Sequence, residues 1–375
     1  MSVVRKSSKE CDECFRCLEL FSVPPSLASG TGGEGSKDHQ AVEALVKTSQ
    51  KPFEKNELAS LAPLSLFEEA MVLAFLFITM GMPLFWFFVF TPYVVIFSSL
   101  ATKVLFALTT LGLATHPLPK IPHEQMRKSP LVFALYKYFS YRFVWKGRLH
   151  EKIRKVGPWL GAGAPHGVLP FANLLSMAGI NSFSFLPGTF KGAPATVVFS
   201  TPFLRYLFLL GPACDVSAKS LERELAKGSF IGLVPDGIAG IFKCSHTSET
   251  VYLKNRKGLA RLALKTGYAL LPAYSMGNTE AFTPWFDPFG LMEWASRKAQ
   301  ASLFFYTGRF GLPLGIPRRT RITMLVGEPV LVQKKENPSP AEIDEVHEEL
   351  LKGIRECFDL HKDSLGWGHK QMKFV

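Results

Sequence analysis

The residues best suited to chemistry are Ala164-Pro165-His166-Gly167, which set a histidine between a short apolar run and a helix-like segment. The apolar run covers 159–162, and the helix-like segment covers 169–178 and is closed by Gly179. A strand, turn and helix in this order display His166 beside a helix N-terminus, where reactive side chains are often found. The positive end of a helix opposes protonation, so we expect a neutral imidazole that can act as a base near pH 7.

A second segment follows an apolar run over 230–234 and reads Pro235-Asp236-Gly237. A strand that ends in such a turn presents a carboxylate at its carboxyl end, which is a common ligand position in open α/β sheets. The same three residues also suit an ordinary turn that takes no part in chemistry. Both interpretations of Asp236 stay open at this point.

A third segment enters a helix that the spacing predicts over 256–266, with Arg256, Lys257 and Gly258 at its start. Basic side chains at a helix start can hold phosphates, although such charges equally suit a solvated helix face. Gly277 and Glu280 then follow an apolar run over 268–273.

Several common catalytic patterns are absent from the sequence. It contains no G-x-S-x-G elbow, no P-loop lysine and no H-E-x-x-H pair. An H-x4-D acyltransferase motif needs an aspartate where Phe171 stands. His166 has no carboxylate in its own turn, so any partner must come from another segment. The cluster Cys11, Cys14 and Cys17 lacks a second ligand pair at zinc spacing, so we expect reduced cysteines or an acylation target, and no metal site.

The composition indicates a protein that associates with membranes. Of the 375 residues, 47% are hydrophobic and 32 are phenylalanine, which is high for a soluble protein that begins with a polar segment. The net charge of +12 suits anionic lipid headgroups or a phosphate-rich ligand such as coenzyme A. Nucleic acid is excluded as the expected partner, because no finger, RNP-like or arginine-rich element appears.

The first third of the chain divides in two by composition. Residues 1–68 are polar with a Gly/Ser-rich stretch, and we expect them to form a disordered tail. Between 70 and 119 the only Asp, Glu, Lys or Arg is Lys103. Its cost at mid-bilayer, about 2.5–3.5 kcal/mol, is offset by the surrounding apolar residues. We therefore expect a membrane hairpin over 69–119, of one or two transmembrane helices, with both termini cytosolic; a buried hairpin of a soluble core is the alternative.

The remainder, 120–375, alternates short apolar runs with amphipathic helices, which predicts an α/β domain behind a proline-rich linker at 117–122. The last helix opens with Ser339-Pro340-Ala341-Glu342, a capping box with proline at the first helical position, and is expected to end near His361. Strands are expected over 159–162, 230–234, 268–273 and 321–326, and helices over 169–178, 217–226, 256–266 and 340–361.

Taken in order, these segments resemble the type-2 diacylglycerol acyltransferase family, which also includes monoacylglycerol and wax-alcohol acyltransferases. That family carries a Pro-His-Gly motif after a membrane hairpin, matched here by Pro165-His166-Gly167. Its Arg-x-Gly-Phe helix is matched by Arg256-Lys257-Gly258-Leu259, and its Phe-Gly-x-x-Glu segment by Met276-Gly277-Asn278-Thr279-Glu280. A late Gly-Glu-Pro stands at Gly327-Glu328-Pro329, so the match spans roughly 135–362.

The resemblance implies a glycerolipid-acyltransferase-like mixed sheet flanked by helices, and acyl transfer from acyl-CoA to diacylglycerol at the endoplasmic reticulum or lipid droplet. His166 would be the general base and Asp236 or Glu280 would orient its imidazole. Amides near Gly167 or Gly237 would stabilise the oxyanion. Acyl-CoA is a co-substrate, so no cofactor is implied. The residues expected to bind substrate are Pro165, Gly167, Gly237, Arg256, Lys257, Gly258 and Gly277.

The sequence also departs from the family pattern. Ala164 stands where His, Glu or Tyr is usual, Leu259 and Met276 replace phenylalanines, and Gly240 replaces a common glutamate. These departures leave two other functions open: a monoacylglycerol or wax-alcohol acyltransferase, and a non-catalytic lipid-droplet or membrane lipid-binding protein. A phospholipid-type acyltransferase is disfavoured by the missing H-x4-D motif. A homo-oligomer is also left open.

Overall fold

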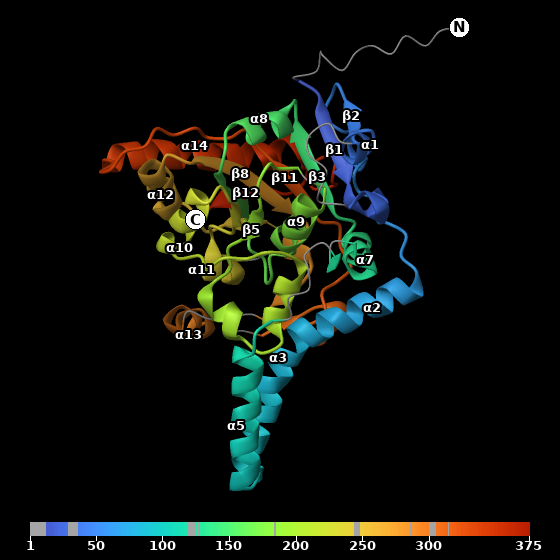
Figure 1. Cartoon of the computed structure of the whole chain (residues 1–375), viewed down its shortest axis with the longest axis vertical. Helices are drawn as coiled ribbons and strands as arrows, with labels where there is room; N and C mark the ends of the chain where they lie inside the picture. Colours follow the sequence, from blue (N-terminus) through green and yellow to red (C-terminus); the bar gives the residue numbers. More distant parts are fainter. Residues whose placement is uncertain are drawn as a thin grey trace.

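The computed structural model describes residues 13–28, 37–118, 125–126, 128–183, 185–243, 248–285, 287–299, 305–313 and 315–375. Its centre is a mixed eight-stranded sheet with the order β2-β1-β3-β11-β8-β4-β6-β5. Helices pack against the sheet, and an apolar hairpin protrudes from the domain as a rod (Figure 1). The predicted α/β class is therefore confirmed.

The strands of the large sheet are β1 (Phe15–Glu19), β2 (Lys47–Ser49), β3 (Arg142–Lys146), β4 (Trp159–Ala164), β5 (Phe190–Gly192), β6 (Phe230–Leu233), β8 (Ala269–Met276) and β11 (Thr323–Val326). Two small sheets pair β9 (Thr283–Pro284) with β10 (Tyr306–Thr307) and β7 (Glu249–Val251) with β12 (Met372–Phe374). The four strands expected from the sequence correspond to β4, β6, β8 and β11. Of these, β8, β4 and β6 are adjacent and parallel.

The main helices of the domain are α7 (Pro130–Tyr138), α8 (Leu149–Lys155), α9 (Phe171–Ser182), α10 (Ala218–Ala226), α11 (Gly237–Phe242), α12 (Gly258–Thr266), α13 (Leu291–Ala299) and α14 (Pro340–His361); a short α1 (Lys37–Glu43) precedes them. The expected capping box of α14 is present, since Ser339 and Glu342 satisfy each other's backbone amides. The expected end of α9 at Gly179 is wrong. A Cβ at 179 would lie 2.6 Å from Leu20 Cδ1, so this glycine allows close packing inside the helix.

Two parts of the N-terminal segment, 13–28 and 37–68, belong to the fold, which corrects the expectation of a disordered tail for these residues. β1 pairs with β2 on one side and with β3 on the other, and Cys17 and Leu18 in it are fully buried. Arg142 of β3 is also fully buried and forms an ion pair with Glu19 at 3.0 Å. Cys17 is a free thiol, whereas Cys14 is disulfide-bonded, so the expectation of reduced cysteines is wrong for Cys14.

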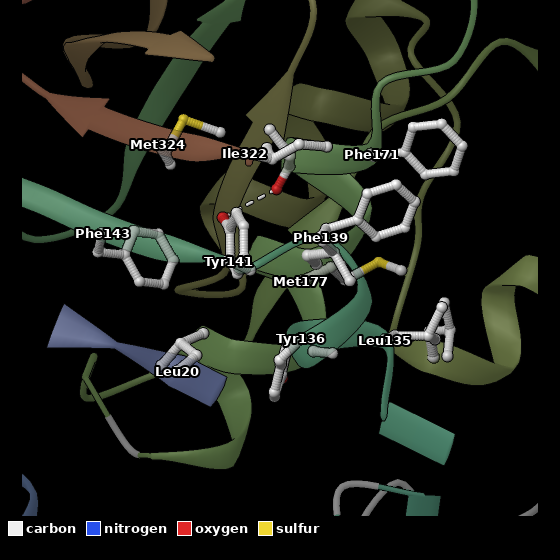
Figure 2. Packing of buried hydrophobic residues seen from close by; sticks show 14 of the residues in the cluster. Leu20, Leu135, Tyr136, Phe139, Tyr141, Phe143, Phe171, Met177, Ile322 and Met324 are labelled. Atoms are coloured by element: carbon white, nitrogen blue, oxygen red, sulfur yellow. Dashed lines mark hydrogen bonds between the residues drawn. The ribbon is translucent and has the colours of Figure 1, made fainter. Parts of the chain in front are cut away.

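An aromatic cluster fixes the start of α9, the helix that follows His166. The ring of Phe139 lies 4.6 Å from that of Phe171, the first residue of α9, and Phe171 lies 5.9 Å from Phe282. Tyr141 donates a hydrogen bond of 3.0 Å to the Ala172 carbonyl oxygen (Figure 2). The beginning of α9 is therefore held by packing and by a buried hydrogen bond.

The hairpin consists of one long helix and one shorter helix. The first runs continuously over Leu66–Phe97 as α2 (Leu66–Leu76), α3 (Met82–Phe85) and α4 (Thr91–Phe97), joined by π-helical turns over Phe77–Gly81 and Trp86–Phe90. It is long and apolar enough to cross a membrane, and only 28% of its most apolar window is buried. The return helix α5 covers Leu100–Thr115, so the second leg of the hairpin starts after Ser99.

Both ends of the hairpin are attached to the domain. Glu68 pairs with Lys137 of α7, and Glu69 pairs with Arg309. At the other end, Arg205 donates from Nη1 to the Leu113 carbonyl oxygen at 3.1 Å, near the C-terminus of α5. The expected linker at 117–122 lies largely outside the described residues.

Candidate active site

Three neighbouring parallel strands end at one edge of the sheet. β4 ends at Ala164 and leads into His166, β6 ends at Leu233 and leads into Asp236, and β8 ends at Met276 and leads into Asn278. The carboxyl ends of adjacent parallel strands meet at the same edge, which is where open α/β sheets bind their ligands. The order β8-β4-β6 therefore sets His166 between the other two side chains.

The backbone of the His166 turn is held from both sides. The His166 amide donates to Asp236 Oδ2 at 3.0 Å, and the His166 carbonyl oxygen accepts from Asn278 Nδ2 at 2.7 Å. The carbonyl oxygen of Pro165 accepts from Ser275 Oγ at 3.1 Å. Gly167 has a φ of 60°, and a Cβ there would lie 2.7 Å from Asn278 Nδ2, so the turn requires glycine.

The imidazole of His166 is partly exposed, and its Nδ1 lies 2.9 Å from the Gly167 carbonyl oxygen. A carbonyl oxygen can only accept, so Nδ1 carries the proton and Nε2 keeps its lone pair. Burial lowers the pKa of His166, and the contact with Gly167 opposes that effect in part. The imidazole is therefore neutral near pH 7, as expected from the sequence, with Nε2 as the basic atom.

The Asp236 carboxyl is fully buried directly behind this turn. Burial raises its pKa to about 7, opposed by the hydrogen bond from the His166 amide and by the charge of Arg256. Its partner is the backbone of His166, whereas the sequence led us to expect contact with the imidazole. A side chain at Gly240 would overlap Asp236 Oδ2, so a buried Asp236 in this position excludes the glutamate that the family pattern has at 240.

The structure separates the two basic residues at the start of α12. Nη1 of Arg256 lies 2.9 Å from the position that a Cβ of Gly237 would take, over the turn that carries Asp236. Gly237 itself has a φ of 50°. Lys257 points outward and pairs with Asp344 of α14 at 2.6 Å, in a surface depression that Arg261 and Lys265 also line. Arg256 is thus near the site, and Lys257 lies on the outer face.

Glu280 belongs to a different cluster from His166. Its Oε1 lies 3.2 Å from Lys370 Nζ, and Lys370 also contacts Glu249 at 3.3 Å. Glu249 is fully buried and accepts hydrogen bonds from Tyr274 and Thr279; burial raises its pKa, and Lys370 opposes that. This cluster fixes the C-terminal strand β12 beside β7.

Gly277 and Gly258, which the sequence predicted to bind substrate, have different places in the structure. Gly277 has a φ of 88°, and a Cβ there would overlap the Arg321 carbonyl oxygen, so it forms the turn that sets Asn278 under His166. Gly258 is the exposed first residue of α12. Among the described residues, no three His, Cys, Asp or Glu side chains gather where they could hold a metal ion.

Asn278 and Ser275 contact the His166 turn but were not singled out from the sequence. Both are almost fully buried, with 1% of their surface exposed. The available signal was their place at the end of a strand that runs parallel to the strand before His166. That pairing can be used only once the strand order is known.

Comparison with known proteins identifies the family. The family model described as diacylglycerol acyltransferase matches residues 98–374, which is well over half of the chain. The chain therefore belongs to the diacylglycerol acyltransferase family, and the resemblance inferred from the motifs is confirmed.

Three relatives illustrate the range of the family. The chain is 28% identical to diacylglycerol O-acyltransferase 2-like protein 6 of Bos taurus over 336 residues, covering 84% of this chain and 98% of the relative. It is 32% identical to diacylglycerol O-acyltransferase 2 of Mus musculus over 267 residues, covering 65% and 68%. It is also 32% identical to acyl-CoA wax alcohol acyltransferase 2 of Homo sapiens over 187 residues, covering 46% and 55%.

Proposed function

We propose that this protein is an acyl-CoA:diacylglycerol O-acyltransferase that makes triacylglycerol, with His166 as the general base. The observation that carries the proposal is the imidazole of His166, whose Nδ1 is directed at the Gly167 carbonyl oxygen while Nε2 keeps its lone pair. Membership of the acyltransferase family supports the reaction class.

In the proposed reaction, Nε2 takes the proton of the acceptor hydroxyl while its oxygen attacks the thioester carbonyl carbon. The tetrahedral intermediate then expels the thiolate of coenzyme A, and the carbon–sulfur bond breaks. The imidazolium returns the proton to the thiolate, which gives the ester and free coenzyme A. A neutral histidine with a lowered pKa suits the first step, because it is unprotonated at the working pH.

Asp236 acts in this proposal as a positioning residue. Its carboxyl oxygen holds the His166 amide and so fixes the turn, while the Gly167 carbonyl fixes the tautomer. Arg256, over the same turn, is a candidate for binding the phosphates of acyl-CoA.

The direct test of the base is His166→Ala, with His369→Ala at an exposed position as the matched control. We expect kcat for labelled acyl transfer to fall by at least about 100-fold in His166→Ala and to be unchanged in the control. Retention of more than about a tenth of wild-type turnover by His166→Ala would contradict the assignment.

The departures Ala164 and Gly240 do not remove a reactive group from the site described above. The side chain of Ala164 is fully buried in β4, and the space at 240 is bounded by Asp236. Both observations favour an enzyme over a non-catalytic lipid-binding protein. Purified chain that binds acyl-CoA without any turnover would favour the second function.

The acceptor needs its own test, because the relatives include a wax alcohol acyltransferase. A panel of diacylglycerol, monoacylglycerol and long-chain alcohol with labelled acyl-CoA distinguishes them. We expect diacylglycerol to have the highest kcat/KM.

We further propose that the hairpin inserts into the endoplasmic reticulum membrane or the lipid-droplet surface, with both termini cytosolic. Its outer half exposes large apolar side chains, among them Ile96 and Phe97 of α4 and Leu105 and Leu108 of α5. Exposed apolar surface of this extent is costly in water and favourable in lipid.

A further inference from the structure

We propose that the chain has a second membrane-contacting element, an aromatic platform beside the hairpin that lies flat on the lipid surface. The platform consists of Trp285, Phe289, Leu291, Trp294, Phe310 and Leu312. This inference rests on the proposed membrane association, because it takes the hairpin as the primary anchor.

The first support is exposure. Trp285, Phe289 and Trp294 expose 63%, 85% and 61% of their surface, and the remaining three expose at least half. All six come from the stretch between β9 and the segment before β11. In the other described parts of the domain, exposed large apolar side chains stand singly in the sequence. The Trp285 amide donates to the Phe305 carbonyl oxygen at 2.7 Å, and Leu291 and Trp294 share one face of α13, so these exposed side chains are not scattered singly.

The second support is continuity with the hairpin. The ring of Phe305, from the same stretch, lies 5.1 Å from that of Phe88 in the hairpin. A Cβ at Gly315 would lie 2.5 Å from the backbone of Gly81, so the chain just after the platform packs directly on the first hairpin helix. Figure 1 shows α13 close to the level at which the hairpin leaves the domain. A membrane entered by the hairpin therefore lies next to the platform.

The third support is the chemistry of α13. Leu291, Trp294 and Lys298 follow helical spacing on its exposed face, and Lys298 Nζ lies 5.1 Å from the Trp294 ring centre. Tryptophan and lysine together are typical of the bilayer interface, where the indole sits at headgroup level and the lysine reaches the phosphates. Glu293, the acidic residue of this helix, has only 19% of its side chain exposed and pairs with Arg297. These features favour a lipid surface over a protein partner.

The inner side of α13 connects the platform to the candidate active site. Glu293 pairs with Lys243, directly after α11, at 3.6 Å, and α11 begins next to Asp236. The guanidinium of Arg297 lies 5.3 Å from the Tyr252 ring centre, and that of Arg256 lies 5.1 Å from the same ring. The ion pair of Glu293 with Lys243 and the Tyr252 ring between Arg297 and Arg256 thus connect the platform to the turn that holds His166.

The first experiment measures depth with the full chain in phosphatidylcholine vesicles. A fluorescent probe is attached to Phe289→Cys in the platform, to Leu105→Cys in the hairpin and to Leu331→Cys, an exposed residue outside both. The wild-type chain labelled in parallel gives the background from its own cysteines. We expect lipids brominated near the headgroup to quench the probe at 289, deep bromines to quench the probe at 105, and neither to quench the probe at 331.

A quenched probe at 105 with an unquenched probe at 289 overturns the platform and leaves the hairpin anchor standing. If the probe at 105 is also unquenched, the membrane association itself is wrong and the platform falls with it. Neither outcome depends on turnover, so both differ from a failure of the proposed acyl transfer.

The second experiment compares two acceptors in Phe289→Ser/Trp294→Ser, with Leu331→Ser as the matched control. We expect KM for a long-chain acceptor in vesicles to rise roughly threefold or more, and kinetics with a water-dispersed short-chain acceptor to stay at the wild-type level. An equal loss with both acceptors indicates damage to the fold, and unchanged kinetics with both indicate that the platform does not contact the lipid; either result overturns the proposal.

Discussion

Asp236 is a buried carboxyl whose protonation is coupled to folding. Its pKa is about 7 in the folded chain against an ordinary value of 3.8, since burial disfavours the charged form. The neutral acid is therefore the form that the fold accommodates best. The stability that this gives is fully present below pH 4 and is lost as the pH rises through about 7.

Asp236→Asn is expected to remove this pH dependence. Between pH 4 and 7 the folded wild type binds one proton more than its unfolded chain. It should therefore lose stability relative to Asp236→Asn by about 1.4 kcal/mol per pH unit. His166 and the other titrating groups are common to both chains, so the difference isolates Asp236. Unfolding midpoints in detergent from pH 5 to 8 measure it, and parallel curves for the two chains would mean that Asp236 is ionised in the fold at no cost.

The same residue offers a test of positioning against charge. Asn keeps an oxygen that can accept from the His166 amide, whereas Ala does not. We expect kcat to fall by less than about tenfold in Asp236→Asn and by about 10- to 100-fold in Asp236→Ala, as for the loss of a buried hydrogen-bond partner. Equal losses in both variants would show that the negative charge is what matters.

Asn278 should behave as a second positioning residue. Asn278→Ala leaves the His166 carbonyl without its 2.7 Å donor, so we expect a loss of about 1–3 kcal/mol in stability and a lower kcat with little change in KM. Steady-state kinetics and unfolding in parallel check both effects. A raised KM with unchanged kcat would indicate instead that Asn278 binds substrate.

The residue scale also shows where sequence reasoning stops. Pattern and motif order identified His166 and Asp236, and the strand order brings the two together. The Asp236 carboxyl accepts its hydrogen bond from the backbone of His166 and not from the imidazole, and no rule of residue spacing predicts this partner. Glu280 is also a carboxylic acid residue and lies in a matching motif, yet it pairs with Lys370, a partner 90 residues away in the sequence.

At the scale of elements, the end of α14 and β1 meet in the core. His361, on the last turn of α14, has 4% of its surface exposed and lies edge-on to the ring of Phe15 at 5.6 Å. Burial lowers its pKa to about 4 from an ordinary 6.5. The unfolded chain therefore takes up a proton below pH 6.5 that the folded chain does not take up until about pH 4.

His361→Leu should accordingly flatten the acid limb of the stability curve. The wild type is expected to lose about 1.4 kcal/mol per pH unit between 6.5 and 4 from this residue, and His361→Leu should not. His369→Gln, at an exposed position, is the matched control. Thermal unfolding at pH 5 and 7 measures the difference, and the idea fails if His361→Leu and wild type lose the same stability on acidification.

The elements that the sequence predicted are those with a clear pattern: four strands of apolar residues and the helices α9, α10, α12 and α14. β1 was missed because Phe15-Arg16-Cys17-Leu18-Glu19 carries two charges within a polar segment. Its ordering depends on Arg142, a residue more than 120 positions later that buries the Glu19 charge. Local pattern contains no information on such a distant partner.

At the scale of the whole molecule, β1 precedes the hairpin and β3 follows it, and the two are paired over five residues. Strands of one sheet lie on the same side of any membrane. If the hairpin inserts into a membrane as proposed, it must cross an even number of times or enter and return, because a single crossing is inconsistent with the fold. Composition alone had left one or two spans open.

We therefore expect both termini to be accessible from the same side. In sealed microsomes, added protease should remove epitope tags at both ends, and carbonate extraction should leave the chain in the membrane. Detergent-lysed microsomes control for the tags' intrinsic cleavability. Protection of one tag alone would require an odd number of crossings and would contradict the pairing of β1 with β3.

The β1–β3 pairing also fixes an order of events during synthesis. Glu19 ends β1 and Arg142 begins β3, so about 120 residues separate the two partners. At typical elongation rates of about 5–20 residues per second, β1 waits roughly 6–25 s for its neighbour. The whole apolar hairpin leaves the ribosome in that interval. In the proposed setting, delivery of the hairpin to lipid thus precedes closure of the sheet, and a nascent chain that misses the membrane is left with an unpaired strand edge as well as an exposed hairpin.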